Sequence, residues 1–179
     1  MKIAIISDTH DNIPNIEKFL SWAKENKIET IIHCGDIATG ETIQYLTKNF
    51  KGKIYLVYGN MDAPYRNEIY KKCNKLKNAK LYGDIGELKI PPSNSSPIKR
   101  GEKLRIAFCH LPNEAKALAQ SGKYNLVFYG HTHKPWLETL PNNCQLVNPG
   151  TLGDVFQKAT FAIFDTAAKN LELKILETL

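Results

Sequence analysis

The chain opens with Ile3-Ala4-Ile5-Ile6, which is followed directly by Ser7-Asp8-Thr9-His10-Asp11-Asn12. A short apolar run without polar interruption is typical of a buried strand. Asp8 and His10 follow this run two residues apart, so they can project to the same side of an extended backbone. Chemistry in open α/β sheets takes place beyond the carboxyl ends of the strands, so this stretch predicts a functional edge.

Composition is that of an ordinary globular protein. With 42% apolar and 23% charged residues, the chain has no segment near the roughly 18 consecutive apolar residues of a membrane span. Its 179 residues fit one core, and we expect residues 1–179 to form a single domain. The N-terminal segment is too short and too soon acidic for a signal peptide, so we expect a cytoplasmic protein without a membrane partner.

Four cysteines lie far apart and form no Cys-x-x-Cys pair. This spacing argues against a zinc ribbon or a thioredoxin-like motif and favours reduced thiols. The net charge of +6 would favour anionic phosphate substrates or nucleic acid. The lysine-rich runs lack the aromatic residues of single-strand binders, so a solvated surface is the simpler explanation. Nucleic acid is therefore open as a partner but not indicated.

Hydrophobic periodicity predicts alternating strands and helices in the first half of the chain. We expect strands at 3–6, 29–33, 53–58 and 79–82, and helices at 14–27, 41–48 and 66–77. A β-α-β-α-β order predicts a parallel sheet with right-handed crossovers.

The second half is predicted to be mainly β. We expect strands at 87–90, 104–108, 124–129, 135–140, 145–147, 160–165 and 170–176, and one helix at 114–120. Residues 91–97 are rich in proline and serine and predict a loop, either a plain surface insertion or a mobile flap.

Five polar signatures follow five of the predicted strands. They are Asp8/His10, Asp36, Asn60/Asp62, His110 and His131/His133. Four of the five histidines fall in these signatures, and a glycine immediately precedes three of them, which permits sharp turns and close backbone approach. Each signature alone could be a helix cap, a turn or a satisfied polar group. Five of them at one sheet edge predict a shared site.

The donor types in these signatures suit two metal ions. Two aspartates, four histidines and one asparagine are too many ligands for one tetrahedral zinc, but suit two adjacent divalent ions with open positions. The candidate ligands are Asp8, His10, Asp36, Asn60, His110, His131 and His133. One carboxylate must bridge, and Asp36 stands alone on its loop. Two adjacent metal ions activate a water molecule and hold the oxygens of an in-line displacement at phosphorus. Cys34 and Cys109 remain minor alternatives as ligands.

The same residues resemble the ordered motifs of the calcineurin-like metallophosphoesterases. The matching motifs are Asp8-Thr9-His10, Gly35-Asp36, Gly59-Asn60-Met61-Asp62, His110 and Gly130-His131-Thr132-His133. The short chain, the opening Ser-Asp-Thr-His-Asp and Asn148-Pro149-Gly150 resemble the compact YfcE-type phosphodiesterases of bacteria and archaea. The resemblance runs from Lys2 to about Asp165.

This resemblance implies an α/β fold, a four-layer α/β/β/α sandwich of two mixed β-sheets, and a metal-dependent phosphodiesterase. It implies one metal on Asp8, His10, Asp36 and His133, and another on Asp36, Asn60, His110 and His131. A metal-bridging hydroxide would attack the phosphorus of a small phosphodiester. Two divalent ions are expected, Mn²⁺ first, with Ni²⁺, Fe²⁺ or Zn²⁺ as alternatives.

Asn60 and Asp62 are the candidate catalytic residues. Asn60 would help to stabilise developing charge. Asp62 and Asp11 are expected to orient histidine or asparagine ligands, with a turn or capping role as the alternative. His33 is expected to be a buried, hydrogen-bonded strand residue, and 148–151 a structural turn near the site.

Two positions depart from the family pattern. Many relatives carry a histidine at the position of Met61, where it assists the leaving group. Its absence predicts a preference for acidic leaving groups, or a proton donor elsewhere. Leu111 stands where a glycine commonly follows the histidine, which predicts a differently shaped loop at His110.

Two other functions remain open. The same scaffold serves as a protein-interaction subunit in the retromer complex, where the metal site is degraded, whereas this chain keeps a full ligand set. The basic charge balance keeps a nucleic-acid-processing nuclease in view. A homo-oligomer is compatible with each of these functions.

Overall fold

The computed structural model describes residues 1–91 and 103–179. Its strands are β1 (Lys2–Ile6), β2 (Thr30–His33), β3 (Lys53–Leu56), β4 (Ala79–Leu81), β5 (Ile85–Ile90), β6 (Leu104–Cys109), β7 (Leu126–Phe128), β8 (Trp136–Thr139), β9 (Gln145–Asn148), β10 (Thr160–Asp165) and β11 (Asn170–Ile175). Its helices are α1 (Ile13–Glu25), α2 (Gly40–Asn49), α3 (Arg66–Cys73) and α4 (Pro112–Gln120), with 3₁₀ turns η1 (Ala63–Tyr65) and η2 (Leu176–Thr178). Every predicted strand and helix is confirmed, with shifted ends. Most of the predicted 91–97 loop lies outside the described residues.

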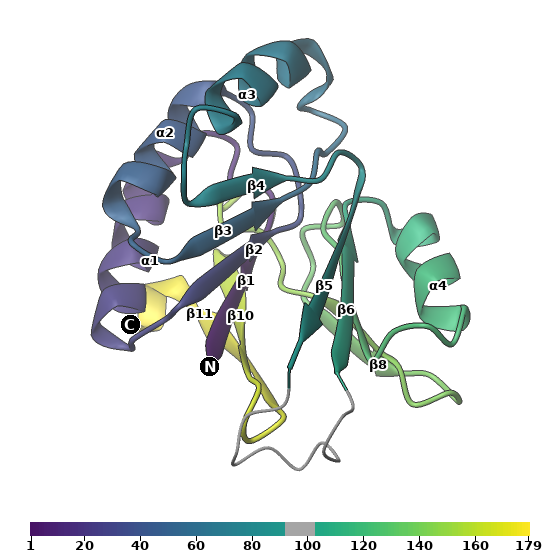
Figure 1. Cartoon of the computed structure of the whole chain (residues 1–179). Helices are drawn as coiled ribbons and strands as arrows, with labels where there is room; N and C mark the ends of the chain where they lie inside the picture. The colour runs from purple at the N-terminus through teal and green to yellow at the C-terminus, as the bar shows by residue number, and fades with distance from the viewer. Residues whose placement is uncertain (92–102) are drawn as a thin grey trace.

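The strands form two mixed sheets (Figure 1). The first has the order β11-β10-β1-β2-β3-β4, in which β1 to β4 run parallel and β10 pairs antiparallel with β1. The second has the order β5-β6-β7-β9-β8, in which β6, β7 and β9 run parallel and the two outer strands are antiparallel. The predicted parallel β-α-β-α-β sheet is therefore confirmed as the centre of the first sheet.

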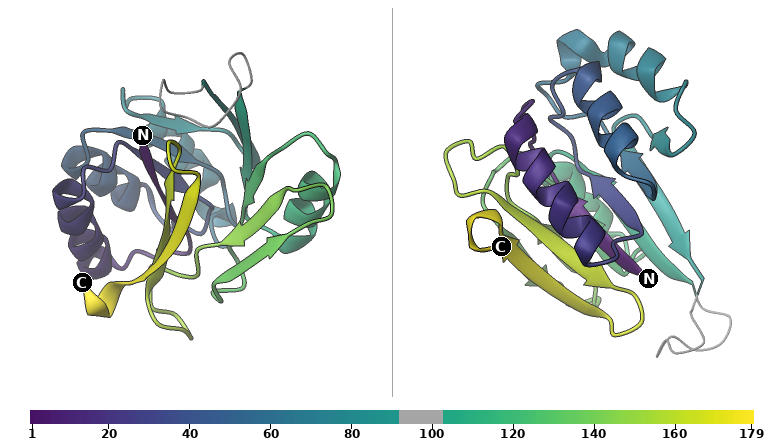
Figure 2. Two further views of the ribbon diagram at one scale, coloured as in Figure 1. Left: turned by 90° about the horizontal axis from the view of Figure 1, so that it is seen from below. Right: turned by 90° about the vertical axis from the view of Figure 1, so that its left-hand side faces the viewer.

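Successive side chains of β1 point to opposite faces of the first sheet, so they pack in two different layers of the core. Ala4 and Ile6 pack in a cluster with α1, α2 and α3, whereas Ile3 and Ile5 pack in the cluster between the two sheets. A third cluster joins Ala107 and Val127 of the second sheet to α4. Helices thus cover the outer face of each sheet, as Figure 2 shows from below. The predicted four-layer α/β/β/α sandwich is confirmed, and β1 is apolar from Ile3 to Ile6 because both of its faces are covered there.

Helix ends follow local side-chain chemistry. Asn12 caps α1 by accepting a hydrogen bond from the Asn15 amide at 3.1 Å, and Pro14 lies in the first turn as predicted. Gly122 follows α4 with a φ of +71°. Within residues 1–91 and 103–179, no helix is long and apolar enough to cross a membrane.

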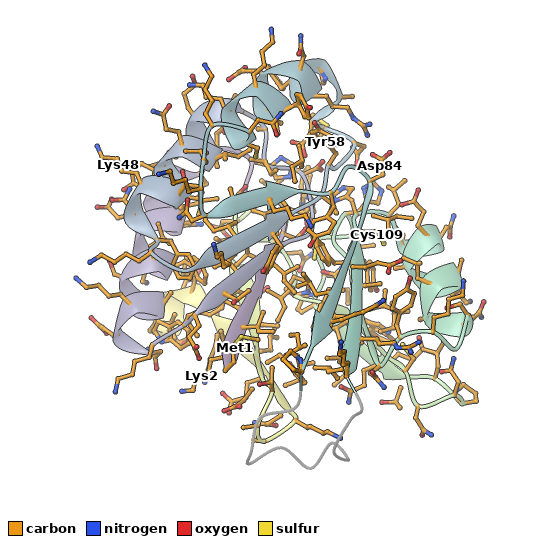
Figure 3. The ribbon with its side chains drawn as sticks, viewed as in Figure 1. Met1, Lys2, Lys48, Tyr58, Asp84 and Cys109 are labelled. Atoms are coloured by element: carbon orange, nitrogen blue, oxygen red, sulfur yellow. The ribbon has the colours of Figure 1, made fainter. Side chains whose placement is uncertain are left out.

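The carboxyl ends of the parallel strands in both sheets meet at one edge of the sandwich. Figure 3 shows Cys109, at the end of β6, and Tyr58, just after β3, on the side of the molecule opposite Met1 and Lys2. Polar residues that follow these strands are therefore delivered to a common place.

Candidate metal centre

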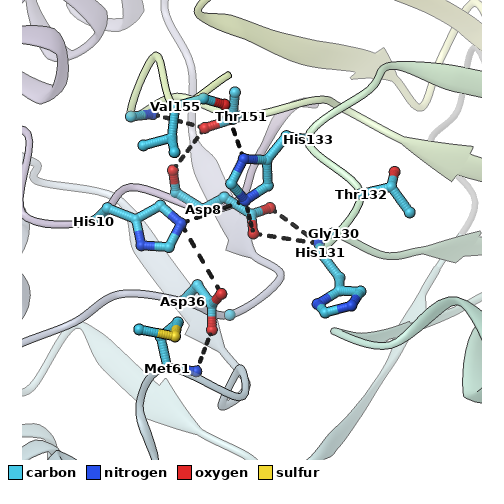
Figure 4. A network of polar contacts seen from close by, with 12 residues as sticks. Asp8, His10, Asp36, Met61, Gly130, His131, Thr132, His133, Thr151 and Val155 are labelled. Carbon is cyan, nitrogen blue, oxygen red and sulfur yellow. Dashed lines mark hydrogen bonds and ion pairs between the residues drawn. The ribbon is translucent and has the colours of Figure 1, made fainter. Parts of the chain in front are cut away.

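Three predicted ligands form the first group of the site: Asp8, His10 and His133 (Figure 4). Nε2 of His133 lies 3.2 Å from Oδ1 of Asp8 and 3.4 Å from Nε2 of His10. Asp8 and His10 follow β1, whereas His133 comes from the loop after β7, 123 residues away. The first group thus draws on both sheets.

Three further predicted ligands form the second group: Asn60, His110 and His131. Oδ1 of Asn60 lies 2.9 Å from Nε2 of His110 and 2.8 Å from Nδ1 of His131. Nitrogen and oxygen donors therefore converge here as well, again from the loops of both sheets.

Asp36 lies between the two groups. Its Oδ2 is 3.4 Å from Nε2 of His110 and 4.0 Å from Nε2 of His10. Its Oδ1 accepts a hydrogen bond from the Met61 amide at 2.8 Å, so the other oxygen is left to face both groups. Donor atoms of Asp8, Asp36 and His110 also lie within 4.8 Å of one another, so the two groups form one continuous site.

Backbone carbonyls orient two of the histidines. Nδ1 of His133 donates to the Val155 carbonyl at 2.9 Å, and Nδ1 of His110 donates to the Cys34 carbonyl at 2.8 Å. In the neutral form of each ring the lone pair is then on Nε2, the nitrogen that faces the carboxylates. Such an outer hydrogen bond is the usual support of a metal-ligating histidine.

Charges inside the site stabilise one another. Hydrogen bonding to Asp8 raises the pKa of His133. Burial would lower the pKa of His110, but the hydrogen bond to Asp36 and the nearby carboxylates raise it overall. Burial would raise the pKa of Asp36, but the hydrogen bonds from His110 and the Met61 amide, together with the charges of His110 and His10, leave the pKa below its ordinary value. The buried carboxylates favour positive charge at this place.

Five of the seven candidate ligands have a left-handed backbone. The φ angles are 53° for Asp8, 43° for His10, 53° for Asp36, 69° for His131 and 58° for His133. This conformation costs a non-glycine residue about 1–2 kcal/mol, and such residues concentrate at functional sites. Sequence periodicity gave no indication of it.

The three glycines that precede ligands are required for close approach. Gly35 has a φ of +95°, and a Cβ there would lie 2.8 Å from Nδ1 of His110. A Cβ on Gly59 would overlap Asp36, and a Cβ on Gly130 would overlap Ser7 and lie 2.7 Å from Oδ2 of Asp8. The predicted role of these glycines is confirmed.

The side chain of Asp62 bonds to backbone amides and not to the side chain of a candidate ligand. Its buried carboxylate accepts hydrogen bonds from the amides of Ile37, Ala38 and Gly59, each at 2.8 Å. Two of these amides directly follow Asp36, and the third directly precedes Asn60. The expectation that Asp62 orients a histidine or asparagine side chain is therefore wrong, because its three amide bonds lock the two ligand loops to each other.

Asp11 likewise contacts no predicted ligand. Its Oδ1 accepts hydrogen bonds from the Thr39 amide and from the hydroxyl groups of Thr39 and Thr42. It fastens the loop after β1 to the start of α2. The expectation of ligand orientation is wrong here too.

Other predictions near the site are confirmed. His33 is fully buried and bonds through Nε2 to the Thr9 hydroxyl at 3.0 Å. Asn148 is buried and donates to the Gly130 carbonyl at 2.8 Å, and the Thr151 hydroxyl donates to the Asp8 carbonyl at 2.9 Å. The 148–151 turn therefore supports the loops that carry the ligands.

The cysteines are poor ligand candidates. Burial raises the pKa of Cys109 to about 12 and raises that of Cys34 well above its usual value. The Cys109 thiol lies 3.7 Å from the Leu111 carbonyl, to which it donates. The remaining set of carboxylate, imidazole and amide oxygen donors fits borderline divalent ions such as manganese, iron, nickel or zinc.

Two neighbours of His133 were missed from the sequence. The Val155 carbonyl holds His133, and the ring of Phe156 stacks on His133 with centroids 6.0 Å apart. The only signal was an isolated aromatic residue in the irregular segment 153–157, which fits neither a strand nor a helix pattern.

Comparison with known proteins identifies the family of this chain. Residues 1–169 match the calcineurin-like phosphoesterase superfamily domain. Phosphodiesterase MJ0936 of Methanocaldococcus jannaschii is 34% identical over 178 residues, covering 99% of this chain and 100% of that protein.

Solved structures show the same fold. A structure of an archaeal phosphodiesterase matches with a TM-score of 0.80 at 28% identity, covering 98% of this chain and 99% of that one. YfcE, a phosphoesterase from E. coli, matches in fold with a TM-score of 0.65 at 16% identity, covering 98% and 100%. The chain therefore belongs to the calcineurin-like phosphoesterase superfamily.

Proposed function

We propose that this protein hydrolyses small phosphodiesters with two divalent metal ions, Mn²⁺ being the first candidate. The observation that carries the proposal is the position of Asp36, whose Oδ2 faces both groups of nitrogen donors while its Oδ1 is held by the Met61 amide. The name of the relative MJ0936 supports a diester as the substrate.

The residues would divide between the two ions. Asp8, His10 and His133 would hold one, Asn60, His110 and His131 the other, and Asp36 both. When bound, such ions supply an activated water for in-line attack at phosphorus and neutralise charge on the phosphoryl oxygens. The outer bonds of His110 and His133 keep their Nε2 atoms aimed inward.

Asn60 has a second part in this proposal. Its Oδ1 points to His110 and His131, which leaves the amide Nδ2 as a hydrogen-bond donor for a phosphoryl oxygen. Met61, by contrast, has no proton to give, and its side chain is 54% exposed. Diesters with acidic leaving groups, which depart without protonation, are therefore expected to react faster than diesters with alkoxide leaving groups.

The test is hydrolysis of bis(p-nitrophenyl) phosphate with and without added Mn²⁺. We expect metal-stimulated turnover that Asp36→Asn reduces by at least about 10³-fold, since the loss of the shared carboxylate removes both ions. Asp84→Asn is the matched control, because Asp84 is an exposed carboxylate that pairs with Arg66. A wild-type protein without turnover in Mn²⁺, Ni²⁺, Fe²⁺ and Zn²⁺ would refute the proposal.

The alternatives receive less support. Five of the seven converging donors lie on strained backbone, and such strain is concentrated at functional sites, which favours a metal-dependent reaction over a protein-interaction scaffold. A nuclease predicts salt-dependent affinity for nucleic acid. Titration with single-stranded DNA at two salt concentrations tests it, and no binding at low salt rules it out. The four free cysteines favour a reducing compartment, and we place the reaction in the cytoplasm.

A further inference from the structure

Phe156 has an unfavourable backbone conformation and an exposed apolar side chain, and the packing of the fold explains neither. Its side chain is 90% exposed, the largest exposed fraction among the large apolar residues of ranges 1–91 and 103–179. Its φ is +62°, a conformation that is unfavourable for a bulky side chain. Since the residue adds almost nothing to a core, its position calls for another role.

The loop that carries Phe156 is held firmly against the metal centre. The Gly153 amide donates to the Asp8 carbonyl at 2.9 Å, and the Asn12 side chain donates to the Gly153 carbonyl at 3.0 Å. Val155 accepts the hydrogen bond from His133 (Figure 4). The backbone on the N-terminal side of Phe156 is thus fixed to the first group of ligands.

The ring of Phe156 lies beside the place where a phosphate would sit. It stacks on His133 with an interplanar angle of 26° and a centroid separation of 6.0 Å. Because His133 is a candidate ligand, a phosphoryl group held at the metals would bring its ester substituent within reach of this ring. High exposure means that most of the ring surface is available to that substituent.

Apolar side chains also flank the second group. Met61 follows Asn60 and is 54% exposed, and Leu111 follows His110 and is 37% exposed. Exposed apolar side chains thus follow two ligands of the second group in the chain, and Phe156 stacks on a ligand of the first. Such side chains can contact organic substituents with flat or apolar surfaces.

We propose that Phe156 is a stacking platform for a planar ring, so that the substrate is a nucleotide phosphodiester whose base lies on Phe156. This inference rests on the proposed function, and it names the substrate class of the same site. Stacking of a base on an aromatic side chain tolerates any base, so the platform selects nucleotides without selecting a sequence.

The test compares two phosphates that differ by the base alone: thymidine 5′-monophosphate and 2-deoxyribose 5-phosphate. Their Kd values are measured by calorimetry on the full-length, Mn²⁺-loaded protein. We expect the nucleotide to bind about fivefold more tightly or better. Phe156→Ala should abolish this difference while leaving the Kd of the sugar phosphate unchanged, and Phe156→Trp should preserve it.

The control variant is Tyr70→Ala, which removes another exposed aromatic side chain from α3 and should change neither Kd. Equal binding of the two phosphates by the wild type would overturn the platform. Equal weakening of both by Phe156→Ala would overturn it too, since Phe156 would then act only by positioning His133. Absence of binding by both ligands would instead contradict the proposed function on which the platform rests.

Discussion

Oδ2 of Asp36 lies 3.4 Å from Nε2 of His110, although the two residues come from different sheets. The side-chain oxygen of Asn60, by comparison, contacts only His110 and His131, which belong to the second group. Within residues 1–91 and 103–179, Asp36 is the carboxylate whose contacts of 4.0 Å or less reach histidines of both groups, and both contacts use Oδ2.

Asp36→Asn should therefore release both metal ions. An amide keeps the size of the side chain but loses the negative charge that two adjacent cations require. We expect wild-type protein to retain two ions per chain after dialysis and the variant to retain fewer than one, measured by elemental analysis. Retention of one tightly bound ion by the variant would contradict a bridge at Asp36.

His10→Ala should release one ion only. His10 belongs to the first group, whereas the ion expected on Asn60, His110 and His131 has no contact with it. The same elemental analysis should find about one ion per chain in this variant, and His131→Ala should give the converse loss. If His10→Ala removes both ions equally, the division of ligands is wrong.

Asp62→Ala should destabilise the fold. The substitution leaves three amides without an acceptor, the buried amides of Ile37 and Gly59 and the part-buried amide of Ala38. Each such loss costs about 1–3 kcal/mol, so we expect the free energy of unfolding to fall by about 3 kcal/mol or more in urea denaturation of the metal-free protein.

Asp62→Asn distinguishes the contributions of the two carboxylate oxygens to stability. Oδ1 accepts from Ile37 and Ala38, whereas Oδ2 accepts from Gly59, where an amide NH₂ would oppose the donor. An intermediate loss is therefore expected. The exposed carboxylate Asp84 is the control, and its replacement by alanine should change stability by less than about 1 kcal/mol. A similarly small effect of Asp62→Ala would contradict the role assigned to this carboxylate.

The fold was largely predictable from apolar periodicity. Runs such as Ile3–Ile6 are buried on both faces, and the sequence indicates this burial because the run contains no polar residue. The pairing of β10 with β1 was not predicted, because it joins residues more than 150 positions apart. Periodicity identifies a strand and the faces it buries, but not its partner.

The site was predictable where it depends on strand ends and not where it depends on loop conformation. All seven candidate ligands converge because parallel strands deliver their following residues to one edge. The roles of Asp62 and Asp11 were missed because each bonds to backbone amides or hydroxyls of another loop. Phe156 was missed because a left-handed, exposed position depends on the contacts of its neighbours.

His33 should make stability fall in acid. The Gly35 amide donates to its Nδ1 at 3.3 Å, so that nitrogen carries no proton, and Nε2 bonds to Thr9. Burial lowers the pKa of His33 from 6.5 to about 3 in the folded state. Between these values the unfolded chain binds a proton that the folded chain does not, so stability rises with pH.

The expected size is roughly 4 kcal/mol of folding free energy lost between pH 7 and pH 3.5 through this one residue. His33→Gln removes the titration and keeps a side-chain acceptor for Gly35. Urea denaturation of both metal-free proteins across this range should show a flatter pH dependence for the variant. Identical slopes for the two proteins would exclude His33 as the source.

Met61→His should speed the hydrolysis of diesters with poor leaving groups. The Met61 side chain is 54% exposed, and its amide already donates to Asp36 whatever the side chain is, so the site should tolerate the change. A histidine there can protonate a departing alkoxide, an effect typically worth about 10²–10⁴-fold. A p-nitrophenolate needs no such proton.

We therefore expect a gain of at least about tenfold in kcat for a dinucleotide and little change for bis(p-nitrophenyl) phosphate. Met61→Gln is the polar control without a transferable proton. Equal gains for both substrates, or from both variants, would show that the side chain at position 61 acts by means other than proton donation.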